Sequence, residues 1–457
     1  MKKLLLTLLV VYLSFFTVTA SADELMDITW AAGYEISDVY RPQSSIIVDG
    51  KTGEVMWQDN SDSLRDPASM SKLMTLYLVY EAIGQGKLSE ATYIRATETD
   101  QAISTIHEIS NNKIYAGVDY SVADLITMAL VKSSNVATVM LANHLSNNDP
   151  DAFLDMMNAK SKELGMTNSI WNNASGAGAS SFYGYYSPKR YDNSASNQTT
   201  AKDMAILVYH FMKNYPAILE HTRHRMVVVM QGTPYEEYFT SYNYSLPGGI
   251  YGIEGVTGLK TGSSPRADYN ISMTIQRGEQ EMIAIVMGVG KWGDDASDFN
   301  RNLIANALIE HFYALYEYRK VLDKGEHTIN GQQIEVLEDL YATIPRGTEP
   351  VFVINGTELT VENGLESISS SIKNAVPVKE VTPISLPSSS EVETRETLEV
   401  SSASTSVEWM SKTNLIYPLV VLLPLSLGSY LLFITLAGNR RRRKERQKTR
   451  SHRRRFK

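Results

Sequence analysis

An uncharged apolar run near the carboxyl terminus limits what this chain can fold into. Leu415–Ala437 comprises 23 predominantly apolar residues without a charge, long enough as a helix to span about 30 Å of hydrocarbon. The tail Arg440–Lys457 carries 12 Lys/Arg and one acid, and the positive-inside rule keeps such a tail in the cytoplasm. We therefore expect a transmembrane helix at 415–437 and a basic cytoplasmic tail at 438–457, with membrane lipid as a partner.

The amino terminus has the layout of an export signal. Lys2 and Lys3 precede an apolar run, and Ala20-Ser21-Ala22 matches an A-x-A cleavage site. An amino-terminal membrane helix is the alternative. We expect a signal peptide at 1–22 and hence a single-pass protein of the cell membrane whose folded part is extracellular. The chain has no cysteine, which excludes disulfides, thiolate metal sites and cysteine nucleophiles.

Charge and composition subdivide the exported part. The whole chain carries −8, to which the basic tail contributes +11 and the signal +2, so residues 23–439 carry −21. So acidic a segment is not expected to bind nucleic acid. Residues 377–414 are rich in Ser, Thr, Glu and Pro and poor in large apolar residues. Such a composition buries too little surface to fold, which predicts a flexible stalk.

Between signal and stalk, hydrophobic periodicity predicts a mixed α/β fold over 23–321, with a sheet packed by helices. Met70, Leu73, Met74, Tyr77 and Leu78 form the apolar stripe of an amphipathic helix that opens at Ser69. Two further helices are predicted to start near Val122 and Val136. Two more are predicted at Thr200–Phe211 and Phe299–Leu315. The predicted strands are Ser45–Val48, Glu54–Gln58, Val256–Lys260, Asp268–Ile275 and Met282–Met287.

In residues 322–376 the predicted secondary structure changes to short strands joined by tight turns. Asn330-Gly331 and Asn355-Gly356 each separate two strand-like runs, and Asn-Gly is the preferred centre of a type I′ hairpin turn. We expect a small all-β domain here.

Three Ser-x-x-Lys quartets occur, at Ser69–Lys72, Ser110–Lys113 and Ser370–Lys373. Only the first opens a predicted helix, where the i, i+3 spacing places hydroxyl and amine on one face. A serine needs a base to act as a nucleophile, and lysine can be that base only when it is neutral. Burial and a second cation both lower a lysine pKa.

Lys260-Thr261-Gly262, at the end of a predicted strand, supplies a candidate second cation. The other Lys-Thr-Gly, Lys51–Gly53, falls in a predicted hairpin turn. Ser133-Ser134-Asn135 lies between two predicted helices. There the Ser133 hydroxyl could relay a proton, and the Asn135 amide could hold a substrate carbonyl. Ser-x-Asn also occurs at Ser110, Ser146 and Ser241, and helix capping is the alternative explanation for Ser133–Asn135.

The order Ser-x-x-Lys, Ser-x-Asn, Lys-Thr-Gly resembles that of the penicillin-binding protein and serine β-lactamase superfamily. The stretches DPASMSKLMT, KSSNVATVMLANHL, TTAKDMAIL and GLKTGSS are similar to the low-molecular-mass D-alanyl-D-alanine carboxypeptidases over roughly residues 30–320. That resemblance implies a β-lactamase/transpeptidase-like fold, in which an antiparallel sheet is packed by helices, and a hydrolase acting on peptidoglycan stem peptides. The family's anchor is often an amphipathic helix on the membrane surface, whereas 415–437 looks long enough to cross it.

The resemblance also implies residue roles. Ser69 would be the nucleophile, Lys72 its base and Ser133 a proton relay. Asn135, Lys260, Thr261, Gly262 and Ser263 would bind substrate, with the N–H groups of Ser69 and Ser263 as the oxyanion hole. β-Lactams would acylate Ser69, and no metal or other cofactor is expected.

Four other functions fit the sequence less well. A class A β-lactamase would need a Glu-x-x-x-Asn pattern, but Glu163 and Asn168 are five residues apart. A β-lactam sensor would need a cytoplasmic signalling domain in place of the short basic tail. A non-catalytic cell-wall-binding protein would not need all three motifs. A metalloenzyme is disfavoured because the His107-Glu108 pair lacks the second histidine of H-E-x-x-H.

Overall fold

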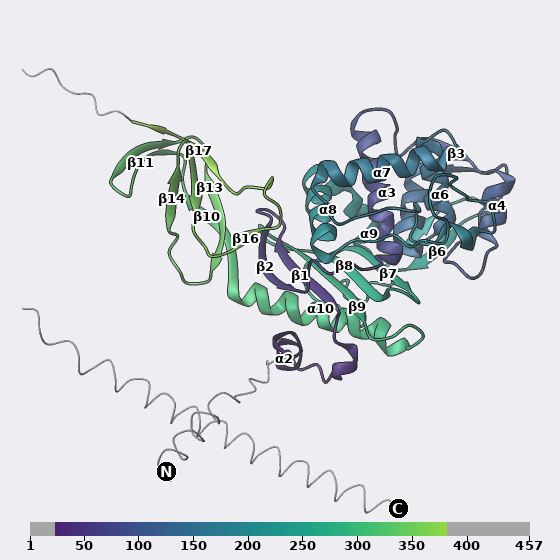
Figure 1. Cartoon of the computed structure of the whole chain (residues 1–457), viewed down its shortest axis with the longest axis horizontal. Coiled ribbons are helices and arrows are strands. Elements are labelled where there is room, and N and C mark those ends of the chain that lie inside the picture. The colour runs from purple at the N-terminus through teal and green to yellow at the C-terminus, as the bar shows by residue number, and fades with distance from the viewer. Residues whose placement is uncertain (1–22, 382–457) are drawn as a thin grey trace, which may run out of the picture. The chain divides into compact units, whose positions relative to one another are not determined.

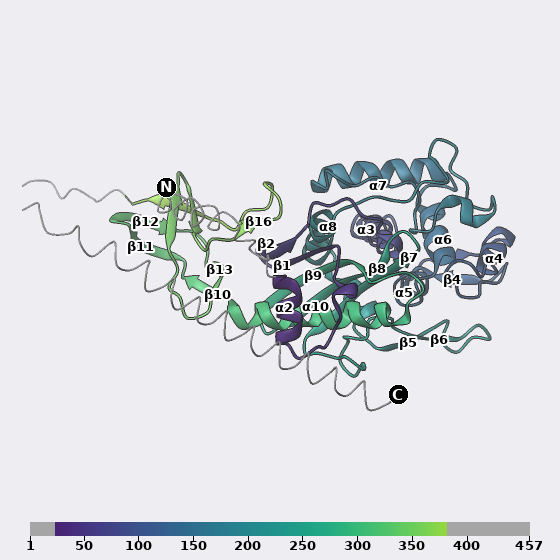
Figure 2. The same ribbon diagram turned by 60° about the horizontal axis from the view of Figure 1, so that its bottom comes forward.

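The computed structural model describes residues 23–381 (Figures 1 and 2). The predicted signal peptide, most of the predicted stalk, the predicted transmembrane helix and the basic tail lie outside these residues. Within residues 23–381, no helix combines the length and the apolar character needed to cross a membrane.

The main sheet has six antiparallel strands in the order β16-β2-β1-β9-β8-β7, in agreement with the predicted antiparallel sheet. Their bounds are β1 Ser44–Asp49, β2 Glu54–Asp59, β7 Val256–Ser264, β8 Asp268–Arg277, β9 Gln280–Val289 and β16 Glu366–Ser367. β7 is the terminal strand of this order, so one of its edges has no strand partner among residues 23–381.

Helices cover both faces of the sheet (Figure 1). Along β9, Ile283, Ile285 and Met287 join one buried cluster, whereas the alternate residues Met282, Ala284 and Val286 join another. A strand buried on both faces reads as a continuous apolar run, which explains the sequence MIAIVM. One face packs on α10 (Asp295–Leu315) and α2 (Glu24–Ala31), and the other on α3 (Lys72–Gly84) and α8 (Ala201–Asn214).

The remaining helices and two short hairpins lie around α3, in the part of the molecule next to β7 (Figure 1). The helices are α4 Glu98–Ser104, α5 Val122–Thr127, α6 Asn135–Leu145, α7 Pro150–Leu164 and α9 Leu219–Thr222. The hairpins pair β3 Tyr93–Arg95 with β4 Asp119–Ser121 and β5 Met226–Val229 with β6 Glu237–Thr240. Single helical turns are η1 Asp38–Tyr40, η2 Ala68–Ser71, η3 Met128–Lys132, η4 Ala179–Phe182 and η5 Pro216–Ile218.

Two details of the predicted secondary structure are wrong. The helix after Ser69 is not amphipathic, because α3 is enclosed by the sheet and by other helices and every residue from Lys72 to Tyr80 is buried. The strand predicted to end at Lys260 continues to Ser264, since β7 pairs with β8 along its whole length. Lys260-Thr261-Gly262 therefore lies inside a strand and not at its end.

The predicted carboxyl-terminal β domain is present. It contains a two-stranded sheet of β10 Tyr316–Leu322 and β13 Leu340–Pro345, and a five-stranded sheet in the order β11-β12-β17-β15-β14. The bounds of the latter are β11 Gly325–Ile329, β12 Gln332–Val336, β14 Phe352–Asn355, β15 Glu358–Val361 and β17 Val376–Glu380. β10 follows α10 directly, so strand structure begins six residues before the expected position 322.

The end of this domain and one of its turns also differ from expectation. β17 extends to Glu380, beyond the expected boundary at 376, because Val376 and Val378 both point into the small core. Asn330-Gly331 forms the predicted two-residue turn, with φ of +53° and +81°. In the second hairpin Asn355 pairs with Glu358 as the last residue of its strand, which places Gly356 at the first turn position.

Candidate active site

Ser69 lies in the 3₁₀ turn η2, immediately before α3. The turn begins at Ala68, whose φ of +46° is unusual for a residue other than glycine. Two hydrogen bonds hold it there, as the Ala68 N–H donates to Asp66 Oδ1 (2.7 Å) and the Ser71 hydroxyl donates to the Ala68 carbonyl (2.7 Å). The sequence prediction that Ser69 opens the helix is thus correct to within one turn.

Two glycines allow other segments to contact the backbone of this turn. A Cβ at Gly262 on β7 would lie 2.4 Å from the Pro67 carbonyl oxygen and 3.1 Å from the Ser69 nitrogen. A Cβ at Gly176, which has a φ of +89°, would lie 1.9 Å from the Ala68 carbonyl oxygen. Only glycine permits such close backbone approach. The strand that carries Lys260 is therefore packed directly against the residue that carries the Ser69 hydroxyl.

The Lys72 amine is completely buried, and its hydrogen-bond partners among the described residues are all neutral oxygens. Its Nζ lies 3.1 Å from Ser69 Oγ, 2.8 Å from Asn135 Oδ1 and 2.7 Å from the Ser175 carbonyl oxygen. Burial, and then the positive charge of Lys260, hold the Lys72 pKa well below its usual value. Among residues 23–381, no carboxylate bonds to this amine, so nothing there compensates the loss of hydration of its charged form.

Lys260 is also buried, and its Nζ donates to Ser133 Oγ (3.0 Å) and to the Thr261 carbonyl (2.9 Å). Burial and the nearby Arg301 guanidinium lower the Lys260 pKa to about 7. Ser133 ends the π-helical turn η3 in a left-handed conformation, with a φ of +62°, and Ser134 caps the amino terminus of α6. This sharp junction aims the Ser133 hydroxyl at β7 while Asn135 faces Lys72.

The Asn135 amide joins two parts of the site. Its Oδ1 accepts from Lys72, and its Nδ2 donates to the Ser110 carbonyl (2.8 Å), which also accepts from the Asn135 backbone N–H (2.8 Å). These contacts fix the orientation of the amide. They also bring Ser110 to the site, which the sequence had not indicated because the segment around Ser110 shows no periodicity.

Arg301 on α10 is a second residue that sequence reasoning missed. It is buried, pairs with Asp298 one turn earlier, and donates from Nη1 to Ser263 Oγ (2.8 Å) and to the Asn270 carbonyl (3.2 Å). A lone arginine in a helix gives no sequence signal of this kind. It reaches the site only because α10 packs across β8 and β9.

These groups open onto two cavities, of about 500 and 470 Å³, that meet at the candidate nucleophile. Ser69, Ser110, Ser263 and Trp292 line both. Ser133, Thr261 and Arg301 line the first, and Asn135 lines the second. All eight predicted site residues therefore either line this cleft or contact a residue that does. Within residues 23–381, no cluster of three or more His, Asp or Glu side chains could hold a metal ion.

A buried amine beside a serine hydroxyl, with a second lysine and an arginine nearby, suits acyl transfer to serine from a substrate that bears a carboxylate. A family model described as D-alanyl-D-alanine carboxypeptidase matches residues 35–291. The chain belongs to this family. Membership makes it a serine-type hydrolase of carboxyl-terminal D-alanyl-D-alanine. A second model, described only as a domain of unknown function, matches residues 318–379.

Individual relatives agree with this assignment. The chain is 27% identical to D-alanyl-D-alanine carboxypeptidase DacF of Bacillus subtilis, over 71% of this chain and 75% of the relative. It is 25% identical to D-alanyl-D-alanine carboxypeptidase DacA of Escherichia coli K12, over 79% and 84% of the two chains. In fold it is similar to the peptidoglycan synthesis regulatory factor (PBP3) of Streptococcus pneumoniae, with a TM-score of 0.63 and 24% identity over 75% of this chain and 99% of that one.

The second Lys-Thr-Gly and the other two Ser-x-x-Lys quartets of this carboxypeptidase do not form a second serine–lysine pair of this kind. Lys51–Gly53 forms the β1–β2 turn, and Lys51 pairs with Glu281. Lys373 pairs with Glu358 in the β domain (3.4 Å). Ser110 lines the cleft, but its hydroxyl donates to the Lys132 carbonyl (3.0 Å), and within residues 23–381 no hydrogen bond joins it to Lys113.

Proposed function

We propose that this carboxypeptidase removes the terminal D-alanine from peptidoglycan stem pentapeptides through an acyl-enzyme on Ser69. The observation that carries the proposal is the Lys72 amine, buried without a counter-ion among residues 23–381 and 3.1 Å from Ser69 Oγ. A neutral amine has two N–H bonds and one lone pair. Asn135 Oδ1 and the Ser175 carbonyl take the two N–H bonds, so the lone pair is left for the Ser69 hydroxyl proton.

Acylation then follows in two steps. Ser69 Oγ attacks the carbonyl carbon between the two D-alanines as its proton passes to Lys72 Nζ. The N–H groups of Ser69 and Ser263 donate to the resulting oxyanion, a contribution of roughly 3–4 kcal/mol per donor. The carbon–nitrogen bond breaks, and the leaving amine receives a proton through the Ser133 hydroxyl. Water hydrolyses the ester, releasing the shortened peptide and restoring the serine.

Substrate binding uses the edge of β7 that has no strand partner among residues 23–381, and the cations beside it. An extended peptide can pair with an unpartnered strand edge through its backbone, and Asn135 can hold one of its amides. The terminal carboxylate would meet Lys260, Thr261 and Arg301, which surround the cavity next to Ser69. β-Lactams, which carry a reactive carbonyl and a carboxylate at similar spacing, would acylate the same serine.

Labelled penicillin followed by peptide mass mapping tests this mechanism. We expect a single adduct on Ser69 that is lost in Ser69→Ala and retained in Ser110→Ala and Ser370→Ala. Product analysis with a free pentapeptide should show release of one D-alanine by the wild-type chain and none by Ser69→Ala. An adduct that survives in Ser69→Ala would refute the assignment of the nucleophile.

We further propose that 415–437 anchors the enzyme by crossing the membrane, with 381–414 as its tether to an extracellular catalytic domain. The support is the uncharged 23-residue run followed by the +11 tail. A crossing helix binds far more strongly than a surface helix. Full-length protein should therefore resist extraction by high salt and alkaline wash and require detergent. Release by either wash would mean that the segment lies on the bilayer surface.

A further inference from the structure

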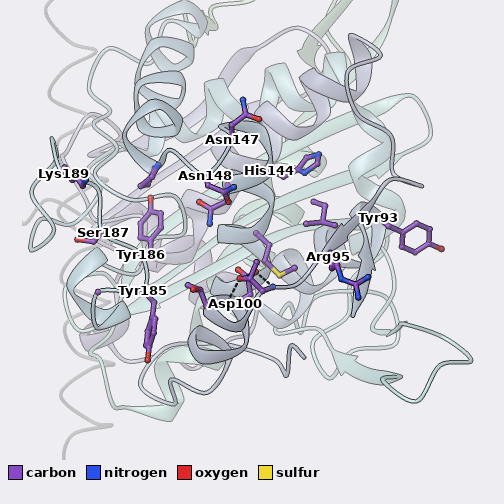
Figure 3. A pocket seen from close by; sticks show the side chains of 17 residues that line it. Tyr93, Arg95, Asp100, His144, Asn147, Asn148, Tyr185, Tyr186, Ser187 and Lys189 are labelled. Atoms are coloured by element: carbon purple, nitrogen blue, oxygen red, sulfur yellow. Dashed lines mark hydrogen bonds between the residues drawn. The ribbon is translucent and has the colours of Figure 1, made fainter. Parts of the chain in front are cut away.

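A large cavity lies outside the catalytic cleft (Figure 3). Its volume is about 990 Å³, about twice that of each active-site cavity. Three segments line it, namely 93–100 around β3 and α4, 140–150 at the end of α6, and 184–189 in the loop after η4. Tyr93 and Tyr185 stand on opposite sides of it, with Asn147, Asn148 and His144 between them (Figure 3).

Five of the side chains that line this cavity make no hydrogen bond among the described residues. Tyr93 and Tyr185 are 68% and 51% exposed, and neither hydroxyl has a hydrogen-bond partner among the described residues. No hydrogen bond within residues 23–381 engages the side chains of Asn147, Asn148 or His144 either. Two aromatic faces and several free amides around a cavity of this size form an uncommitted site for a polar ligand with apolar faces.

The cavity is also connected to the active site by the chain itself. The segment 97–110 lines this cavity at one end and the cleft at Ser110, and the segment 176–189 lines the cleft at Gly176 and this cavity beyond Gly184. The third connection is α6, which begins at Asn135 in the cleft and lines the cavity at Met140 and Asn143. Five to eight residues along a helix rise about 8–12 Å.

A stem peptide is long enough to cover that separation. An extended peptide covers about 3.3–3.6 Å per residue, so four residues span about 13–14 Å. A pentapeptide whose terminal D-alanines lie at Ser69 is therefore long enough for its amino-terminal end, the end that is attached to sugar in peptidoglycan, to reach this cavity.

We propose that this cavity binds the glycan strand of the substrate, as a subsite for N-acetylated amino sugars. The proposal rests on the proposed function, because that function places the stem peptide in the cleft. Tyrosine rings can cover the C–H faces of sugar rings, and amide groups such as those of Asn147 and Asn148 can donate to and accept from hydroxyl and acetamido groups. Lys189 at the margin can meet a carboxylate on the glycan, whereas Arg95 already pairs with Asp119 (3.3 Å) and Asp100 is engaged by Thr97.

The test compares two substrates of the full-length enzyme in detergent, a free pentapeptide and the same pentapeptide carried on a tetrasaccharide of N-acetylated amino sugars. We expect the wild-type KM to be about tenfold lower for the glycan-borne peptide, the size of one good aromatic contact. The double variant Tyr93→Ala/Tyr185→Ala should lose this advantage and keep the wild-type kcat and KM for the free pentapeptide. Tyr183→Ala is the matched control, since Tyr183 is 66% exposed on the same loop but does not line the cavity.

Equal wild-type KM values for the two substrates, or a double variant indistinguishable from wild type, would overturn the inference and leave the proposed function intact. Failure of the wild type to release D-alanine from the free pentapeptide would instead overturn the proposed function. Titration of Ser69→Ala with the peptide-free tetrasaccharide gives a readout independent of turnover. The triple variant Ser69→Ala/Tyr93→Ala/Tyr185→Ala should bind the tetrasaccharide at least tenfold more weakly than Ser69→Ala does. Binding that depends on ionic strength and not on these two tyrosines would contradict a sugar subsite.

Discussion

Replacing Gly262 by alanine tests whether β7 must lie directly against the Ser69 backbone. The added Cβ would lie 2.4 Å from the Pro67 carbonyl oxygen, whereas ordinary contacts begin near 3.4 Å. The strand and the Ser69 turn must therefore separate by about 1 Å, and neither is free to move alone, because β7 is paired with β8 through Ser264. A displacement of about 1 Å in an active site can cost about 100-fold in rate.

The assay is the second-order rate constant for acylation by a fluorescent penicillin, measured beside the free energy of unfolding. We expect Gly262→Ala to acylate about 100-fold more slowly and to lose about 1–3 kcal/mol of stability through overpacking. Gly278→Ala is the control, because Gly278 lies in the β8–β9 turn with a φ of +60° and open space around it. It should lose about 1–2 kcal/mol through backbone strain alone and acylate at the wild-type rate.

Two results would refute this reasoning. Acylation of Gly262→Ala within about threefold of wild type would show that the close approach is not needed for catalysis. A comparable loss of acylation in Gly278→Ala would show that general destabilisation of the sheet, and not the geometry of the cleft, controls the rate.

The two buried lysines give the remaining predictions. Lys72→Arg should abolish acylation, because arginine keeps the cation but does not deprotonate in proteins; near-normal acylation would mean that Lys72 acts only through its charge. In the wild type, acylation should fall as pH drops through the lowered Lys72 pKa, since protonation removes the base. The Lys260 pKa is about 7 in the folded protein, against 10.5 for a lysine in water. Between pH 7 and 9 the unfolded chain therefore binds more protons than the folded chain. Because of this difference, the free energy of unfolding rises with pH over that range. Denaturant titrations at pH 7 and 9 should show that Lys260→Met reduces this rise by roughly 2 kcal/mol; an unchanged rise would mean that Lys260 is charged in the folded enzyme.

The sequence alone determined the local structure and the identity of the chemical groups. Strand and helix periodicities located the main sheet, α8, α10 and the β domain, because these patterns depend on residues two to four positions apart. The order of the three motifs pointed to Ser69, Lys72 and Lys260, and the need for a neutral base pointed to a second cation near Lys72. Asn330-Gly331 formed its predicted turn because that turn depends on only two residues.

Tertiary structure decided everything that depends on packing between distant segments. Burial of α3 on all sides, the length of β7, and the position of Arg301 beside Ser263 all follow from how the sheet and helices close on one another. The same holds for Gly176 and Gly262, whose importance lies in a backbone contact with a turn far away in sequence. A lysine pKa responds to lost hydration and to charges within a few ångströms, so the sequence could name Lys72 and Lys260, but only the fold could remove both amines from water and place them near one another.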